Sequence, residues 1–174
     1  MDLSDVDIRR FHPFQVNERY RYERTGEALG LLYAMHWPFF QPKTSRGIRR
    51  SVLHDRLKDA GACFGEMAGW ERANWFAPEG MEPRYEYTYR RQNWFEASAS
   101  EHLAVRENVG FFDMSSFGKF LVQGKDAEKV MNLICANQVA VEPGKVVYTA
   151  WLNERGGFET DLTVTRLSEW EYLV

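Results

Sequence analysis

The sequence predicts an α+β protein in which a helical N-terminal segment and an irregular linking region precede a strand-rich C-terminal part. Residues 17–36 combine a helix-capping asparagine with charged helix formers, and residues 126–136 also favour a helix. Residues 146–165 instead predict two strands joined by a tight turn. Asn153 and the pair Gly156–Gly157 supply turn chemistry between flanks rich in β-forming residues.

Composition narrows the classes of function. The 174 residues are 44% hydrophobic and 27% charged, as in folded domains rather than disordered chains. The net charge of -3 argues against nucleic acid as a partner. No apolar run approaches the roughly 20 residues that span a bilayer, and residues 1–7 are acidic without a signal-peptide pattern. We therefore expect no membrane partner and a cytoplasmic location.

Cysteine and histidine spacing does not predict a metal site. Cys63 and Cys135 lie far apart among small apolar residues, which favours two buried thiols over a disulfide. The four histidines have no metal-ligand spacing to one another. We also find no G-x-G-x-x-G after a strand, no P-loop and no G-x-S-x-G, so the chain has no self-sufficient redox or phosphate-binding motif.

The N-terminal elements follow from local signals. Asn17 caps the first predicted helix and Pro38 ends it. Ser51 caps a short helix over residues 52–60, which Gly61 ends. Residues 61–76 are rich in glycine and tryptophan but lack a clean period, so we expect a compact loop or irregular strands. Their aromatic side chains are expected to fill a core or to line an apolar pocket.

A turn cluster over residues 78–83 predicts a boundary that divides the chain into residues 1–83 and 84–174. Alternating tyrosines over residues 85–89 predict a short strand or an extended arm. Ser98 or Ser100 is expected to cap a helix over residues 101–109. A strand over residues 119–123 and the helix over residues 126–136 then lead to the hairpin.

Residues 171–174 read as the start of another strand without a visible partner. A strand that lacks a ladder partner exposes unpaired backbone groups and favours association with other chains. We therefore expect a piece of a longer protein, prone to self-association through exposed strands.

Asp161 is the sharpest candidate for chemistry, because it interrupts the apolar alternation of the hairpin. A carboxylate in a β-rich stretch needs a hydrogen-bond partner or a ligand, and it can accept a proton or hold a cationic nitrogen. Tyr148 on the partner strand suits stacking on a flat heterocycle. On the pattern alone, a satisfied turn and core packing remain the commoner explanations of these two residues. A lone His102 and the basic residues of 46–50 favour surface or salt-bridged roles.

Several motifs resemble known families. Residues 101–120 (EHLAVRENVGFFDMSSFGKF) resemble the opening of the aminomethyltransferase, or glycine-cleavage T-protein, family, and the resemblance runs from about residue 85 to the end. Residues 31–38, 53–57 and 69–76 resemble the central region of flavin-dependent dimethylglycine and sarcosine dehydrogenases. Residues 84–174 would then be the truncated N-terminal part of a T-protein-like folate-binding domain.

The resemblance implies a parent enzyme in which an FAD domain oxidises an N-methyl amine and a fused domain passes the one-carbon unit to tetrahydrofolate. Its partners would be the amine and folate, and its location the mitochondrial matrix in a eukaryote. The FAD-binding motif is absent from this chain, so we expect the isolated chain to be inactive. Two alternatives remain open: a non-catalytic folate-fold binding or assembly module, and part of a flavin-free aminomethyltransferase.

The resemblance also implies site residues. Asp161 would be catalytic and support proton handling at the folate nitrogens, while Phe117, Leu121 and Tyr148 would line the folate cavity. Phe117 stands where the family typically has a methionine, and Ser116 replaces a common histidine.

Overall fold

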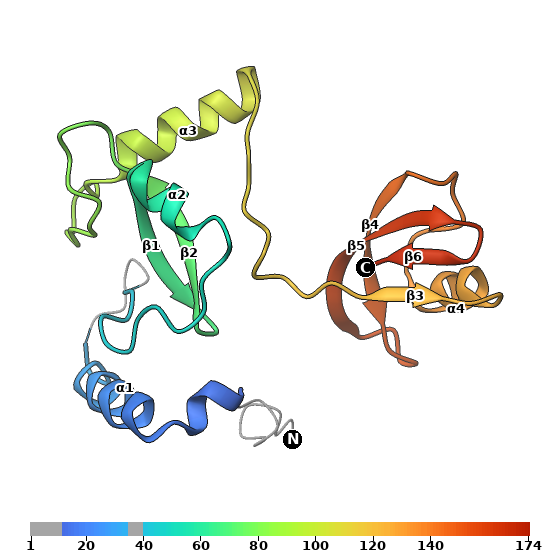
Figure 1. Cartoon of the computed structure of the whole chain (residues 1–174), viewed down its shortest axis with the longest axis horizontal. Helices are drawn as coiled ribbons and strands as arrows, with labels where there is room; N and C mark the ends of the chain where they lie inside the picture. Colours follow the sequence, from blue (N-terminus) through green and yellow to red (C-terminus); the bar gives the residue numbers. More distant parts are fainter. Residues whose placement is uncertain (1–11, 35–39) are drawn as a thin grey trace. The chain divides into compact units, whose positions relative to one another are not determined.

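The computed structural model describes residues 12–34 and 40–174. These residues form two compact units that divide between Ser116 and Phe117, and each is described by itself (Figure 1). The predicted α+β class is confirmed, since helices accompany a two-stranded and a four-stranded antiparallel sheet.

Helix α1 spans Glu18–Gly30 and follows a short 3-10 turn, η3, at Pro13–Val16. The predicted cap is confirmed, because Asn17 Oδ1 accepts a hydrogen bond from the backbone N–H of Tyr20 at 3.1 Å. The helix ends earlier than predicted. The expected end at Pro38 lies outside the described residues.

Residues 61–76 form an antiparallel hairpin with a register irregularity, which agrees with the expected irregular strands and makes the alternative of a compact loop wrong. Strands β1 (Ala62–Met67) and β2 (Trp70–Phe76) pair with one bulge after Cys63, and helix α2 (His54–Asp59) precedes them. Ala68 and Gly69 both have positive φ, at 50° and 81°, which is the backbone of a two-residue hairpin turn. Trp75 of β2 is fully buried.

Charged side chains attach α1 and the basic connector, residues 40–50, to this hairpin. Arg24 Nη1 lies 2.5 Å from Glu66 Oε2 of β1. The carboxylate of Glu27 accepts hydrogen bonds from the backbone N–H groups of Lys43 and Thr44 at 2.6 and 2.9 Å. These contacts join segments that are distant in sequence, so much of the order in this unit comes from polar pairing.

Arg46 and Glu71 make a further pair, in which the Glu71 side chain is only 5% exposed. The guanidinium donates to both carboxylate oxygens, at 2.9 and 2.5 Å, and the backbone N–H of Gly47 donates at 2.6 Å. Burial by itself raises the pKa of Glu71, but the hydrogen bonds from Arg46 and Gly47 outweigh it, so the pKa lies below its usual value. The salt-bridged interpretation of Arg46 is confirmed.

Helix α3 spans Phe95–Glu107 and begins earlier than predicted. Ser98 lies inside the first turns, where its N–H donates to the carbonyl of Trp94, so the predicted serine caps are wrong. Before the helix, the tyrosine segment is an extended arm rather than a strand. The rings of Tyr85 and Tyr87 stack with centroids 5.8 Å apart.

The second unit is a four-stranded sheet of order β3-β6-β5-β4 with one helix. Its elements are β3 (Leu121–Gln123), α4 (Ala127–Ile134), β4 (Val146–Leu152), β5 (Phe158–Ser168) and β6 (Glu171–Leu173). The hairpin of β4 and β5 is confirmed. The interpretation of residues 171–174 as a strand without a ladder is wrong, because β6 pairs with both β3 and β5. The edges of this sheet are β3 and β4.

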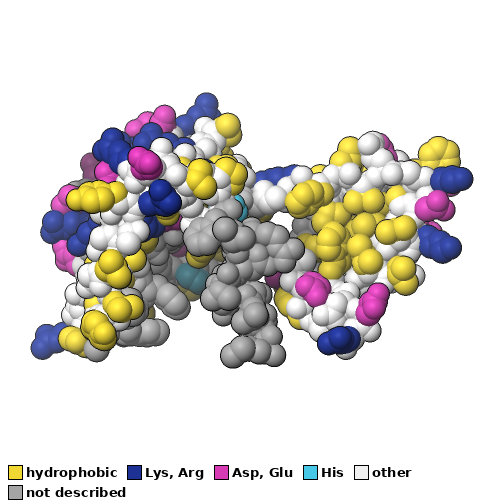
Figure 2. Space-filling model, turned by 90° about the horizontal axis from the view of Figure 1, so that it is seen from below, with side chains coloured by type: hydrophobic (Ala, Val, Ile, Leu, Met, Phe, Trp, Pro, Cys, Tyr) yellow, Lys and Arg dark blue, Asp and Glu magenta, His cyan; other side chains and the backbone are white. Residues whose placement is uncertain are grey.

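The core of this unit lies between α4 and one face of the sheet. Met131, Val139, Val164 and Tyr172 are fully buried, and Ala127 and Cys135 complete the cluster. Hydrophobic side chains also reach the surface, since Figure 2 shows them gathered on one face of this unit. Successive side chains of a strand point to opposite faces, so the sheet has a second face that points outward from the core.

Candidate functional site

The outward face of the four-stranded sheet carries three of the four predicted folate residues. Asp161 is paired with Ala150, and Tyr148 with Thr163, so these residues share one face of the β4–β5 hairpin. Leu121 of β3 lies on the same face, because directly paired residues of neighbouring strands point to the same side of the sheet. The row runs from β3 to β4 through Leu121, Leu173, Thr165 and Val146.

Tyr148 and Asp161 are diagonal neighbours that form a hydrogen bond. The Tyr148 hydroxyl donates to Asp161 Oδ2 at 2.6 Å. This bond and the negative charge of Asp161 raise the pKa of Tyr148. Among the described residues, Asp161 Oδ1 has no hydrogen-bond partner. The carboxylate is therefore oriented through one oxygen and presents the other to solvent.

Apolar side chains elsewhere in this unit are also exposed. Leu121 is 53% exposed, Val146 61% and Tyr148 65%. Phe117, in the segment before β3, is 48% exposed, and its carbonyl accepts a hydrogen bond from Lys119 Nζ at 2.9 Å. A sheet face with exposed apolar side chains and one carboxylate fits a flat, largely apolar molecule that carries basic nitrogens. The residues present therefore fit the folate that the resemblance implies.

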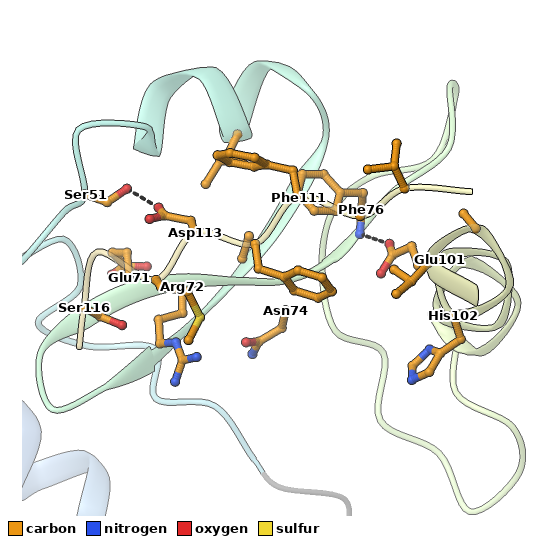
Figure 3. Close-up of a pocket in the computed structure, with 18 of the residues that line it drawn as sticks. Ser51, Glu71, Arg72, Asn74, Phe76, Glu101, His102, Phe111, Asp113 and Ser116 are labelled. Atoms are coloured by element: carbon orange, nitrogen blue, oxygen red, sulfur yellow. Dashed lines mark hydrogen bonds between the residues drawn. The ribbon is translucent and has the colours of Figure 1, made fainter. Parts of the chain in front are cut away.

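A separate pocket of about 630 Å³ lies within the first unit, between β2, α3 and the extended residues 109–116. Phe76, Val105 and Phe111 belong to its apolar lining, and Arg72, Glu101 and His102 to its polar lining. Figure 3 shows Arg72, Asn74 and His102 extending toward the same side of the view. Part of the prediction for residues 61–76 is confirmed, because Trp70 and Phe76 line a pocket while Trp75 fills the core.

Two hydrogen bonds, drawn in Figure 3, hold the walls of this pocket together. Glu101 Oε1 accepts the backbone N–H of Phe76 at 2.7 Å, which fixes α3 against β2. Ser51 Oγ donates to Asp113 Oδ2 at 2.5 Å, which fixes residues 109–116 near α2. Sequence reasoning missed both carboxylates. Glu101 was predicted only as the first residue of the helix over residues 101–109.

The other candidate residues make contacts that indicate structural roles. His102 is exposed, and its Nδ1 lies 2.6 Å from the carbonyl oxygen of Ser98. Arg49 stacks over the rings of Phe14 and Trp70. Both cysteines are buried free thiols, as predicted, and burial raises the pKa of Cys63 to about 11. Such a thiol is unreactive near neutral pH.

Within residues 12–34 and 40–174, no helix has the length and hydrophobicity of a membrane span. The same residues contain no group of three or more histidine, cysteine or acidic side chains arranged to hold a metal ion.

Comparisons with known proteins agree with this architecture. Residues 53–174 match the GCVT N-terminal domain, and residues 1–51 match the FAD dependent oxidoreductase central domain. The first match begins upstream of residue 84, so it spans the boundary predicted at 83/84, which stays a prediction.

Two relatives cover nearly the whole chain. A 4-methylaminobutanoate oxidase (formaldehyde-forming) of Paenarthrobacter nicotinovorans is 50% identical over 99% of this chain and 21% of its own length. Mitochondrial sarcosine dehydrogenase of Homo sapiens is 37% identical over 96% of this chain and 21% of its own length. The chain thus spans about a fifth of these relatives.

The fold has a counterpart among solved structures. The glycine cleavage system aminomethyltransferase T from Bartonella henselae is 26% identical, with a TM-score of 0.54, over 73% of this chain and 30% of that protein. The sheet, its outward carboxylate and the family match over residues 53–174 lead to one assignment: the chain belongs to the GCVT N-terminal domain family, preceded by a segment of the FAD dependent oxidoreductase central domain.

Proposed function

We propose that this chain is the segment of a flavin-dependent N-methyl amine oxidoreductase that transfers the one-carbon unit to tetrahydrofolate. The observation that carries the proposal is the Tyr148–Asp161 pair on an exposed apolar sheet face of a GCVT-family domain. The family resemblance implies amines of the dimethylglycine and sarcosine type as substrates. Both relatives described above bear names of N-methyl amine oxidoreductases.

In this proposal Asp161 is the catalytic residue, and Phe117, Leu121 and Tyr148 line the folate site. FAD bound elsewhere in the parent protein would supply the oxidation, as acceptor of the hydride equivalent from the amine. Asp161 then takes the proton that the folate nitrogen releases as it bonds to the one-carbon unit. Its free Oδ1 is suited to this step, and the ionised carboxylate also stabilises the transient positive charge.

The apolar side chains around the pair have a second role. Leu121, Val146 and Phe117 offer a hydrophobic surface for the folate ring system. Tetrahydrofolate seated there shields Asp161 from water, which strengthens the interaction of the carboxylate with a developing cation.

The test is Asp161→Asn in a parent protein that carries both the flavin domain and this segment. We expect the folate-dependent product to fall by about 10²-fold or more, while amine oxidation, followed by flavin reduction, stays unchanged. Free formaldehyde should then account for the missing one-carbon product. Glu159→Gln, an exposed acid on the same strand, is the matched control and should leave both activities intact.

Two results would reject the assignment. Equal loss of oxidation and transfer would mean that Asp161 supports the whole fold. Unchanged transfer would mean that its carboxylate is not the proton acceptor, and would favour a non-catalytic binding or assembly module.

A further inference from the structure

We propose that Asn137 is a positioning residue for the Tyr148–Asp161 pair, because its side chain holds the part of β4 that carries Tyr148. Asn137 lies in the loop after α4, residues 135–145, and belongs to none of the site residues that the resemblance implies. The inference rests on the proposed function, since it names what sets the geometry of that same site. A series of hydrogen bonds leads from this loop to the carboxylate.

The loop after α4 begins along the outer edge of β4. The backbone N–H of Ala136 donates to the carbonyl of Ala150 at 2.9 Å, beside an isolated antiparallel bridge. The next contact along the strand comes from a side chain. Nδ2 of Asn137 donates to the carbonyl oxygen of Tyr148 at 2.8 Å. The amide group therefore takes the place of a backbone donor and extends the pairing by two residues.

The carbonyl of Tyr148 needs a donor from outside the sheet. It points to the same outer edge as the carbonyl of Ala150, so it cannot also bond to β5 on the other side. Without Asn137, water would be its partner at this edge. A donor fixed within the fold restrains the backbone of Tyr148 more tightly than exchanging water does.

Asn137 is itself held by a buried residue. Its backbone N–H donates to Thr149 Oγ1 at 3.0 Å, and Thr149 is only 2% exposed. Because successive residues of a strand point to opposite faces, Thr149 lies on the core face and Tyr148 on the outward face. Asn137 thus connects the two faces of β4: its backbone is anchored at the core face, and its amide holds a residue of the outward face.

This restraint reaches Asp161 through the phenol of Tyr148. The hydroxyl donates to Asp161 Oδ2 at 2.6 Å, and this bond depends on where β4 places the ring. A small displacement of the strand would lengthen the bond and let the carboxylate rotate away from its ligand. Misplacement of a reacting group by about 1 Å can cost 10²-fold in rate. Asn137 therefore acts on the chemistry through Tyr148.

The experiment is Asn137→Ala in a parent protein that carries both the flavin domain and this segment. We expect kcat of one-carbon transfer to fall about tenfold, as the loss of one hydrogen bond allows. KM for tetrahydrofolate should stay within about twofold, because the apolar side chains of the sheet face remain. Amine oxidation should not change. Asn132→Ala, the matched control, removes a hydrogen bond to the N–H of Val139 in the same loop and should leave kcat unchanged.

A second readout follows Tyr148 without any folate chemistry. The hydrogen bond to Asp161 and its negative charge raise the pKa of Tyr148. Asn137→Ala should loosen this bond and lower the pKa of Tyr148 toward its ordinary value. The measurement is an NMR titration of the full chain with isotope-labelled tyrosine rings, in which Tyr148→Phe identifies the signal. Asn132→Ala should leave this titration unchanged.

Tyr148→Phe tests the next link of the series, because it keeps the ring and removes only the hydroxyl. It should lower kcat with little change in KM, and Asn137→Ala should cause no further loss in this background. The inference is overturned if Tyr148→Phe or Asn137→Ala leaves kcat unchanged, if Asn132→Ala lowers kcat equally, or if the titration of Tyr148 does not move. It is also overturned if Asn137→Ala still lowers kcat in the Tyr148→Phe background.

Failure of this inference and failure of the proposed function are distinguishable. If Asp161→Asn impairs transfer while Asn137→Ala changes neither kcat nor the titration of Tyr148, only the positioning role is rejected. If Asp161→Asn leaves transfer unchanged, the proposed function is rejected whatever Asn137→Ala does.

Discussion

The two units of this chain are held together by different forces. In the first, α1, the connector and the β1–β2 hairpin are joined by ionic and hydrogen-bonded side chains such as Arg46 and Glu71. In the second, α4 covers one sheet face through a continuous apolar cluster that includes Met131 and Val164. Among the described residues of the first unit, few side chains are fully buried, whereas the second unit has a small apolar core.

This difference indicates which kinds of change should destabilise each unit. Buried ion pairs depend on both partners, since removal of one leaves an uncompensated charge in a poorly hydrated site. Apolar clusters depend on volume, since a truncated side chain leaves a cavity. The first unit should therefore respond to changes of charge and pH, and the second to changes of side-chain size.

Arg46→Met should give the largest effect. It leaves the Glu71 carboxylate buried with only the Gly47 N–H as a strong donor, which should cost the first unit about 3 kcal/mol. Hydrogen exchange of β1 and β2 amides would measure the loss, with β5 amides as the internal reference. Arg84→Met removes a pairing in which the arginine side chain is 61% exposed, and it should change exchange little because solvent screens exposed ion pairs. Equal effects of the two variants would contradict the comparison.

Met131→Ala should destabilise the second unit by about 3 kcal/mol, because the side chain is fully buried beneath the sheet. Exchange of β5 and β6 amides should accelerate while that of β1 and β2 stays constant. Leu133→Ala, on the same helix but 82% exposed, is the size-matched control and should change little. An equally large effect at Leu133 would show that the core does not lie where the structure places it.

Acidification should weaken the first unit through Glu71. Its pKa in the folded chain is lowered, so its stabilising contribution is complete above the unfolded pKa near ~4.3 and is lost as the pH falls through the lower folded value. Exchange of β2 amides measured from pH 7 toward acid should show this loss. Glu71→Gln should flatten that pH dependence, and an unchanged slope would assign it to other carboxylates.

Sequence reasoning succeeded where turn chemistry was unambiguous. Asn153 and Gly156 predicted the β4–β5 turn, and Asn153 indeed accepts hydrogen bonds from two following N–H groups. The β1–β2 hairpin was missed for the opposite reason. Its turn places Ala68 at positive φ, which alanine rarely adopts, and both faces of its strands carry buried side chains, so no alternation is visible.

The two candidate sites also differ in how well the sequence predicted them. Asp161 stood out because it interrupts the apolar alternation of a predictable hairpin, and Tyr148 because it lies on the partner strand, although their hydrogen bond depends on the exact strand register. The pocket was not predictable, because Phe76, Glu101 and Asp113 come from three segments that meet only in three dimensions. A local sequence pattern does not indicate which distant segments come together in the folded chain.

The interior position of β6 has a consequence for synthesis on the ribosome. The strand made last of the four lies between β3 and β5, so β3 has no partner in this sheet until residues 171–173 have left the exit tunnel. Pairing of Leu121 with Leu173 closes a long loop, and long-range strand pairing is slow. The nascent second unit should therefore remain open through most of its translation and complete its sheet in one late step.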